Sequence, residues 1–214
     1  MNRHADPDPP HDHTVTTFGV IRHAETVWNR EKRIQGHRDS PLTAEGEHMA
    51  DRWGLRLREF KWNRILSSDT GRAMETARRI NAHLGLPMET DPRLRELDWG
   101  EWSSKTVAQL RQEQADVLAI QEQAGWDFRP PQGESRRSQL ERTCRVLLEA
   151  AGRCPGDCIL VVTHGGVLRC LALGLGGSGL AQVDDIGVKE YRLHWVSVAD
   201  GRLALERPGG LALP

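Results

Sequence analysis

Two short continuous runs of apolar residues stand out in the pattern of hydrophobic and polar positions. They cover residues 16–22 (TTFGVIR) and 158–163 (CILVVT), and each run leads directly into a histidine. Runs of this length without regular polar alternation are typical of strands that are buried on both faces of a parallel sheet. We therefore expect two central strands, one ending at His23 and the other at His164.

Polar and apolar positions recur at helical spacing between and after these strands. A helix is expected to run from its N-cap, Thr43, to about residue 60, and another over about 70–84, ended by Gly85. The other predicted elements are a polar helical stretch at 105–123, a loop at 126–135, an amphipathic helix at 138–153, a helix that begins at 167–173, short extended pieces at 63–66, 88–90 and 94–99, and a hairpin over 190–198 and 202–205.

Strands that alternate with helices predict an α/β fold. We expect a three-layer sandwich with a mainly parallel central sheet, helices on both faces, a small helical cap insertion at about 101–134 and a C-terminal hairpin. A length of 214 residues suits one domain, here 15–214, after a disordered tail at 1–14 that is rich in Pro, Asp and His. The hairpin either completes an edge of the sheet or forms a dimer contact, so a homodimer stays an open alternative.

The charge balance excludes a global field that would attract nucleic acid or a membrane. Lys and Arg number 29, Asp and Glu number 30, and the formal net charge is −1. The first residues have no apolar core of the signal-peptide type, and no run reaches the length of a membrane span. The four cysteines lack zinc-like spacing and are interpreted as reduced thiols. We expect a cytoplasmic protein without a nucleic-acid or membrane partner.

The two strand-terminal histidines are the first candidates for chemistry. In open α/β sheets, ligands bind beyond the carboxyl ends of the strands. If the two strands are neighbours, His23 and His164 lie side by side at one such edge, with the fixed cation of Arg22 next to them. Because burial of unpaired charge is unfavourable, this group is expected to face something negative.

The residues around the first histidine resemble a known family. Arg22-His23-Ala24-Glu25-Thr26, with Asn29, is similar to the R-H-G-x-T-x-x-N signature of the histidine phosphatase superfamily, in its phosphoglycerate-mutase-like branch. Further blocks follow in the family's order: IQG at 34–36, SPLT at 40–43, SSDTGRAMETA at 67–77, LRELDWG at 94–100, QGES at 132–135 and VTHGG at 162–166. An ordered series that covers about residues 17–175 is a specific signal, whereas the first motif alone would be weak.

The resemblance implies roles for five residues. His23 would be the nucleophile that forms a phosphohistidine, and neutral imidazole is competent for this near neutral pH. The ring would need an orienting hydrogen bond to its other nitrogen, expected from a backbone carbonyl of the same loop. Arg22, Arg72 and His164 would surround the phosphoryl oxygens. Glu96 would protonate the leaving oxygen and then activate water.

The same resemblance implies a set of contacts to phosphate or substrate. The residues are Asn29, Thr26, Gln35, Gly36 and Gly165. No motif points to a metal or another cofactor, so we expect none, and the expected partner is a small phosphorylated metabolite. Four arginines are candidates to contact a distal acidic group, although a solvated loop charge is the commoner role for each: Arg38, Arg129, Arg136 and Arg137.

The family contains both phosphatases and mutases on one core. A mutase must hold a bisphosphorylated intermediate away from water, which calls for additional cations in a longer closing segment. Here the segment 101–134 is short, and before Arg129 its cations are Lys105 and Arg111. We therefore favour a phosphatase that hydrolyses small phosphomonoesters through a phosphohistidine on His23. The alternatives are a cofactor-dependent phosphoglycerate mutase and, from another class, a non-catalytic protein that binds phosphorylated ligands.

Overall fold

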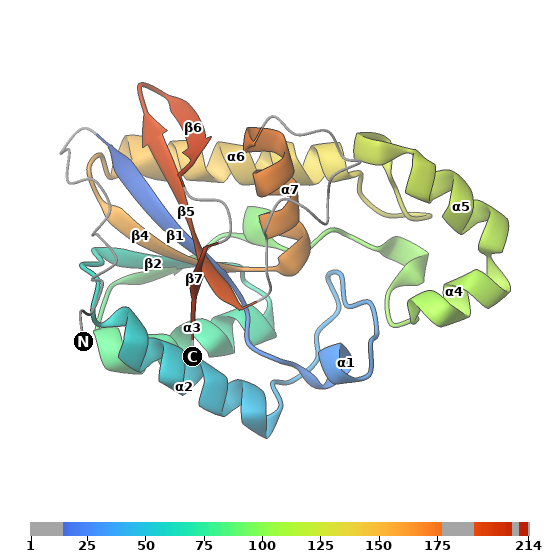
Figure 1. The fold of residues 1–214 in the computed structure, drawn as a ribbon, viewed down its shortest axis with the longest axis horizontal. Coiled ribbons are helices and arrows are strands. Elements are labelled where there is room, and N and C mark those ends of the chain that lie inside the picture. The colour runs from blue at the N-terminus through green and yellow to red at the C-terminus, as the bar shows by residue number, and fades with distance from the viewer. Residues whose placement is uncertain (1–14, 177–190, 207–209, 214) are drawn as a thin grey trace, which may run out of the picture.

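A seven-stranded mixed sheet lies at the centre of the fold (Figure 1). The computed structural model describes residues 15–176, 191–206 and 210–213. The strands are β1 (Thr16–Arg22), β2 (Arg64–Ser67), β3 (Met88–Thr90), β4 (Cys158–Thr163), β5 (Arg192–Ala199), β6 (Arg202–Leu205) and β7 (Leu211–Ala212). Their order is β3-β2-β4-β1-β5-β6, with β7 paired to β5. The first four are mutually parallel, whereas β5 runs antiparallel to β1 and β6. The predicted hairpin thus completes an edge of the sheet.

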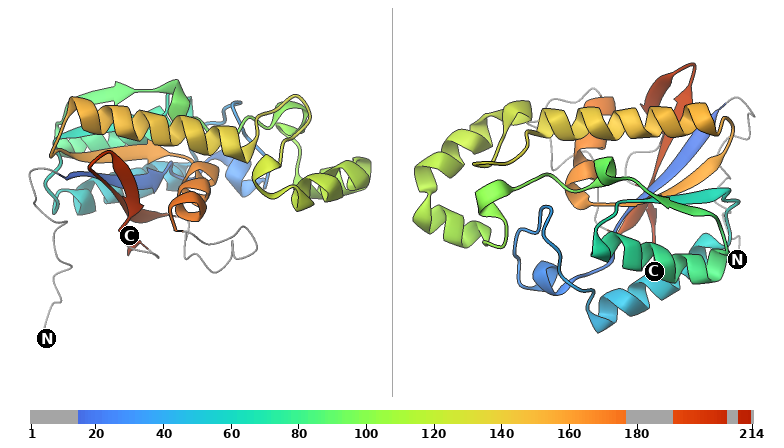
Figure 2. Two further views of the ribbon diagram at one scale, coloured as in Figure 1. Left: turned by 90° about the horizontal axis from the view of Figure 1, so that it is seen from above. Right: turned by 180° about the vertical axis from the view of Figure 1, so that it is seen from behind.

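Helices cover both faces of this sheet (Figure 2). The long helices among the described residues are α2 (Ala44–Leu57), α3 (Gly71–Leu84), α6 (Arg136–Arg153) and α7 (Gly165–Leu175). Alternate residues of β1 point to opposite faces, as the pleat requires. Ile21 packs in one cluster with Trp53 of α2. Phe18 packs in the other with Leu147 of α6 and Leu171 of α7. The expected α/β sandwich is confirmed.

Local signals fix the ends of two helices where the sequence predicts them. The Thr43 side chain accepts a hydrogen bond from the Gly46 amide at 2.9 Å and so caps α2. Gly85 ends α3 in the left-handed conformation, with a φ of 67°. α2 ends three residues before the predicted residue 60, at Leu57.

The connection between β3 and α6 forms a small helical cap at one end of the molecule (Figure 1). It contains α4 (Val107–Glu113) and α5 (Ala115–Gln123), so the helical stretch expected over 105–123 is divided into two helices. Leu110 and Leu118 of these helices pack with Trp102 and Phe128 in an apolar cluster separate from the two sheet faces. The cap therefore has a small core of its own.

The piece predicted as extended at 94–99 forms no strand in the described part of the chain. Pro92–Leu94 is a single 3-10 turn, and the residues that follow have no strand partner. Side chains from elsewhere satisfy this backbone instead: Arg142 donates to the carbonyl oxygens of Arg93 and Glu96 at 2.5 and 3.0 Å. The short helix α1 (Val27–Arg30) and strand β7 were not predicted.

Some predictions fall on parts that the structure does not describe. The tail at 1–14 and the first residue of the predicted hairpin lie outside the described residues, and the domain limits 15–214 stay a prediction. Cys144, Cys154, Cys158 and Cys170 are free thiols, as expected. Within the described ranges, no helix combines the length and apolar character needed to cross a membrane.

Candidate active site

Pairing of the two apolar strands brings the two histidines together. β1 and β4 are parallel neighbours in a register that sets Ile21 opposite Val162 and Arg22 opposite Thr163. The next residues, His23 and His164, therefore emerge at the same sheet edge, with ring centroids 5.2 Å apart and ring planes at 61°. This confirms the side-by-side placement expected from the sequence.

His23 is held as a neutral imidazole with a defined tautomer. Its Nδ1 lies 2.8 Å from the carbonyl oxygen of Ala24, which can only accept, so Nδ1 carries the proton. Nε2 is then unprotonated, and its lone pair accepts a hydrogen bond from the Arg72 Nε at 3.3 Å. Burial, together with the charges of Arg22 and Arg72, lowers the pKa of His23 well below 6.5. Ala24 is the loop carbonyl expected to orient the ring.

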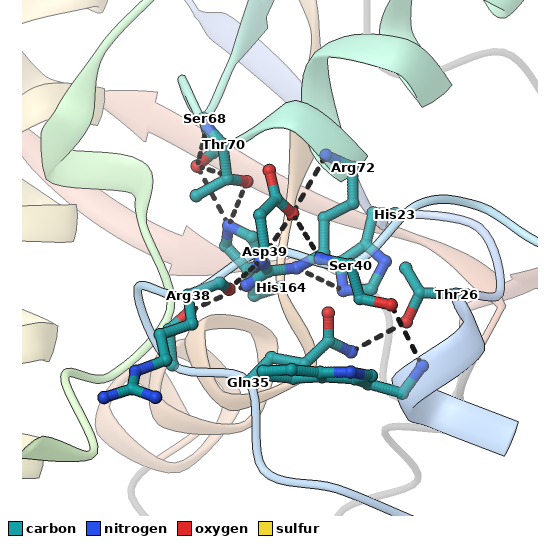
Figure 3. A network of polar contacts seen from close by, with 12 residues as sticks. His23, Thr26, Gln35, Arg38, Asp39, Ser40, Ser68, Thr70, Arg72 and His164 are labelled. Atoms are coloured by element: carbon teal, nitrogen blue, oxygen red, sulfur yellow. Dashed lines mark hydrogen bonds and ion pairs between the residues drawn. The ribbon is translucent and has the colours of Figure 1, made fainter. Parts of the chain in front are cut away.

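His164 has the complementary hydrogen bonds (Figure 3). Its Nδ1 accepts from Arg72 Nη2 at 3.2 Å, and its Nε2 lies 2.9 Å from the Ser68 hydroxyl. Burial and the nearby Arg72 lower the pKa of His164 well below 6.5 as well. Two neutral histidines thus flank one guanidinium group.

Arg72 organises the centre of the site, although it is a helix residue that is only 2% exposed. All five of its guanidinium N–H groups have acceptors: the His23 Nε2, the Arg38 carbonyl at 2.8 Å, the Asp39 Oδ1 at 3.0 Å, the Gly36 carbonyl at 2.8 Å and the His164 Nδ1. The bonds to the two imidazoles are the longest, at 3.3 and 3.2 Å. They are therefore the ones that an incoming phosphoryl oxygen would most easily replace.

Arg22 and Glu96 line a cavity of about 270 Å³ beside the histidines. Gly165 and Gly166 at the start of α7 complete this part of the wall. A side chain at Gly166 would overlap the Glu96 carboxylate, because a Cβ there would lie 2.1 Å from its Oε1. Gly166 thus permits close approach of the carboxylate to the helix.

Three N–H donors hold the Glu96 carboxylate in one orientation. Oε1 accepts from the Leu97 amide at 2.8 Å and from the Gln139 side chain at 3.0 Å, and Oε2 accepts from the Gly166 amide at 2.9 Å. The Glu96 main chain is fixed as well, since its carbonyl accepts from Arg142 at 3.0 Å. The carboxylate is thus a positioned group at the cavity wall and not a solvated charge.

The other predicted contact residues fall into two groups. Thr26 and Asn29 form the cap of α1: the Thr26 hydroxyl donates to Asn29 Oδ1 at 3.0 Å and accepts from the Gln35 amide nitrogen at 2.8 Å. The Gln35 Oε1 is buried and has no hydrogen-bond partner within the part of the chain that the structure describes. Gly36 has a φ of 55° and directs its carbonyl to Arg72. A role of these residues in phosphate binding stays a prediction.

The comparison with family models assigns the chain. Residues 18–209 match the model of the histidine phosphatase superfamily, branch 1. The chain belongs to this superfamily. A relative named "Probable phosphoglycerate mutase GpmB" from Escherichia fergusonii is 40% identical over 152 residues, or 71% of each chain.

Solved structures of histidine phosphatases share the fold. YhfR of Bacillus stearothermophilus superposes with a TM-score of 0.80 and 31% identity, covering 92% of this chain and 98% of that chain. The alpha-ribazole phosphatase from Shigella flexneri gives 0.78 and 26%, with 92% and 98% covered. A mycobacterial glucosyl-3-phosphoglycerate phosphatase gives 0.80 and 25%, with 92% and 99% covered.

Several residues of this histidine phosphatase site were missed in the sequence. Asp39 accepts from both the Arg72 backbone amide and its guanidinium, and Ser68 accepts from His164. Arg142 and Gln139 hold Glu96 from helix α6. Asp39 lies directly before the SPLT block and Ser68 lies within the SSDTGRAMETA block, so their positions next to the family motifs could have suggested them. Arg142 and Gln139 carry no local signal that separates them from ordinary helix residues. Among the described residues, no three His, Cys, Asp or Glu side chains group as a metal site.

The buried histidines make the stability of this histidine phosphatase depend on pH. Because the native pKa values of His23 and His164 lie well below 6.5, the unfolded chain binds more protons than the native state just below that pH. The free energy of unfolding is therefore expected to fall between about pH 6.5 and 5, by about 1.4 kcal/mol per pH unit for each histidine. Most carboxyl groups titrate below this window.

Urea denaturation across this pH range measures the effect. Replacement of both buried histidines by asparagine should flatten the slope, whereas His48→Asn, at an exposed position on α2, should leave it unchanged. A wild-type stability that stays constant from pH 6.5 to 5 would contradict the neutral, buried state of the two rings.

Proposed function

We propose that this histidine phosphatase hydrolyses small phosphomonoesters through a phosphohistidine on Nε2 of His23. The observation that carries the proposal is the tautomer of His23: the proton on Nδ1 is bound by the Ala24 carbonyl, so the lone pair on Nε2 is available. The low pKa keeps this ring unprotonated at and below neutral pH. The nucleophile therefore needs no separate base to activate it.

In the first step, His23 Nε2 attacks phosphorus, and the bond between phosphorus and the ester oxygen breaks. Arg72 and Arg22 neutralise the phosphoryl oxygens, with Arg72 exchanging its bonds to the two imidazoles for bonds to the substrate. A protonated Glu96 gives its proton to the leaving oxygen. The buried Gln35 Oε1 would accept a hydrogen bond from a hydroxyl group of the substrate.

In the second step, water attacks the phosphohistidine. The Glu96 carboxylate takes a proton from this water, the bond between phosphorus and Nε2 breaks, and inorganic phosphate leaves. Glu96 is again protonated and His23 again neutral, so the cycle closes without another reactant. Because the guanidinium groups of Arg22 and Arg72 neutralise the negative charge of the phosphoryl oxygens, we propose that the reaction needs no metal ion.

The cap favours hydrolysis over mutase chemistry. Lys105, one of its few cations, is paired with Glu113 at 2.7 Å, and Arg137 beside the cap is paired with Asp127 at 3.0 Å. Neither of these two cations is therefore free to enclose a bisphosphorylated intermediate from the cap side. The relative named a phosphoglycerate mutase keeps mutase activity as the second candidate. Cytoplasmic location and lack of a nucleic-acid partner stay proposals from the sequence, as does the homodimer alternative.

Hydrolysis of para-nitrophenyl phosphate from pH 5 to 8 tests the proposal. We expect release of nitrophenol. Because no step uses a metal ion, about 5 mM chelator, in excess over the protein, should change the rate of release by less than about two-fold. A conversion assay with 3-phosphoglycerate and 2,3-bisphosphoglycerate, run on the same protein, measures mutase activity. If isomerisation of phosphoglycerate is faster than release of inorganic phosphate, the protein is a mutase and the proposed phosphatase activity is wrong.

A further inference from the structure

The cavity beside Glu96 extends away from the histidines between α6 and α7. Arg136 at the start of α6 and Arg169 on α7 line it, with Trp99 and Leu173 as apolar wall. Among the described residues, its lining contains the guanidinium groups of Arg22, Arg136 and Arg169 and the carboxylate of Glu96. Two of these guanidinium groups, those of Arg136 and Arg169, lie beyond the phosphate end of the cavity at Arg22.

The helical spacing on α7 separates the two ends of the cavity. Gly165 lies against the Arg22 side chain, and the Gly166 amide binds Glu96. Arg169 follows Gly165 by four residues, which puts it on the same face about 6 Å further along the helix axis. Leu173 continues this face by another turn. One small molecule can therefore reach from the phosphate end to Arg169.

Arg136 is held in place although no carboxylate neutralises it. Its guanidinium lies over the Phe128 ring, 4.1 Å from the centroid, and donates to the Gly125 carbonyl at 3.3 Å. Burial lowers the pKa of Arg136, and the neighbouring charge of Arg169 lowers it further. Within the described residues, neither arginine forms an ion pair. Arg136 is thus partly desolvated close to a second positive charge, that of the exposed Arg169, and an anion bound between the two would relieve their repulsion.

The remaining groups of the wall do not oppose an anion. Burial raises the pKa of the Cys170 thiol to about 12, so this cavity residue is neutral. Trp99 and Leu173 suit a carbon chain rather than a second polar group. Of the four arginines considered from the sequence, Arg136 lines this cavity, whereas Arg137 is exposed and paired with Asp127.

We propose that Arg136 and Arg169 bind a second anionic group of the substrate, at the end distant from the transferred phosphate. The inference rests on the proposed phosphatase function and narrows its substrates to short phosphomonoesters that carry a carboxylate or a second phosphate. Guanidinium groups bind both anions through paired N–H donors. The two arginines determine specificity and take no part in the bond-breaking steps.

A matched pair of substrates tests the proposal. 3-Phosphoglycerate and glycerol 3-phosphate differ in one group, a carboxylate in the first and a hydroxymethyl in the second. We expect the wild-type protein to have the higher kcat/KM for 3-phosphoglycerate. Replacement of both arginines (Arg136→Gln with Arg169→Gln) should lower that kcat/KM by about 10- to 100-fold and leave that of glycerol 3-phosphate within about two-fold. Glycerol 1,3-bisphosphate replaces the carboxylate by a phosphate and shows which anion is preferred.

The control variant is Arg111→Gln, at an exposed cap position outside the cavity, and it should behave as wild type. The single variant Arg169→Gln alters an exposed side chain and tests the site even if the double variant does not fold. If wild type, the double variant and Arg169→Gln have equal kcat/KM values for 3-phosphoglycerate, the inference is wrong. Hydrolysis of glycerol 3-phosphate in the same experiment would still support the phosphatase. If no ester is hydrolysed, the proposed function is wrong. Calorimetric Kd values for 3-phosphoglycerate and glycerol 3-phosphate, measured with wild type and the variants, then test the anion site without turnover.

Discussion

Replacement of His23 by alanine is expected to lower kcat for every phosphomonoester by about 10⁴-fold or more. The variant lacks the Nε2 lone pair on which the covalent intermediate forms. Arg22 and Arg72 remain, so the phosphate end of the cavity keeps its positive charge. We therefore expect inorganic phosphate still to bind while turnover is lost, which separates the nucleophile from the binding groups.

Rapid mixing with a ³²P-labelled substrate, followed by denaturation in alkali, measures this effect. Wild-type protein should retain label in an acid-labile, alkali-stable form, as expected for phosphohistidine, and His23→Ala should retain none. His48→Ala is the matched control, because His48 is an exposed histidine on α2. Normal turnover by His23→Ala, or equal labelling of the two proteins, would exclude His23 as nucleophile.

The strand ends were predictable because the signals that determine them are local. An apolar run identifies a buried strand wherever it occurs, and parallel strands end at a common edge. His23 and His164 could therefore be placed at the same end of the sheet from residues 16–23 and 158–164, whereas their contact depended on the two strands being neighbours, which the structure shows. The cap at Thr43 and the stop at Gly85 are equally local, since each depends on one side chain or one φ angle.

The support of the site could not be predicted in the same way. Asp39 binds Arg72 across 33 positions of the chain, and Arg142 binds the carbonyl of Glu96 across 46. Such contacts depend on how separate loops meet, which no periodicity encodes. The segment 94–99 shows the same limit: it was predicted as a short extended piece, but the Arg142 side chain, a long-range partner, donates to the carbonyls of Arg93 and Glu96.

The Arg72 network also connects burial with reactivity. Arg72 is almost completely buried, yet two of its hydrogen bonds go to neutral imidazole nitrogens rather than to carboxylates. Carboxylate partners for these two N–H groups would compete with phosphate, whereas imidazole nitrogens are weaker acceptors. Asp39 neutralises the far side of the guanidinium and fixes its plane. The site thus contains one buried cation, Arg72, and the side of its guanidinium group that contacts His23 and His164 can bind an anion.

Replacement of Glu96 by glutamine is expected to lower kcat by about 10²- to 10⁴-fold, while the Kd for inorganic phosphate changes by less than about three-fold. Glutamine has nearly the same shape and retains a carbonyl oxygen for the Leu97 amide or the Gln139 side chain. It cannot give up a proton to the leaving oxygen or take one from water. The loss should therefore be in turnover and not in binding, and a protein that only binds phosphorylated ligands would show no turnover before or after the change.

Two substrates divide the effect of Glu96→Gln between the two steps. Nitrophenolate is a good leaving group that needs little protonation. para-Nitrophenyl phosphate should therefore still give a burst of about one nitrophenolate per site, followed by slow turnover that is limited by hydrolysis of the phosphohistidine. An alkyl ester such as glycerol 3-phosphate, whose leaving oxygen needs the proton, should give no burst. The exposed Glu101→Gln in the same segment is the control and should keep wild-type kinetics. Unchanged turnover in Glu96→Gln would remove Glu96 from the mechanism, and loss of phosphate affinity instead would make it a binding residue held by Gly166 and Gln139.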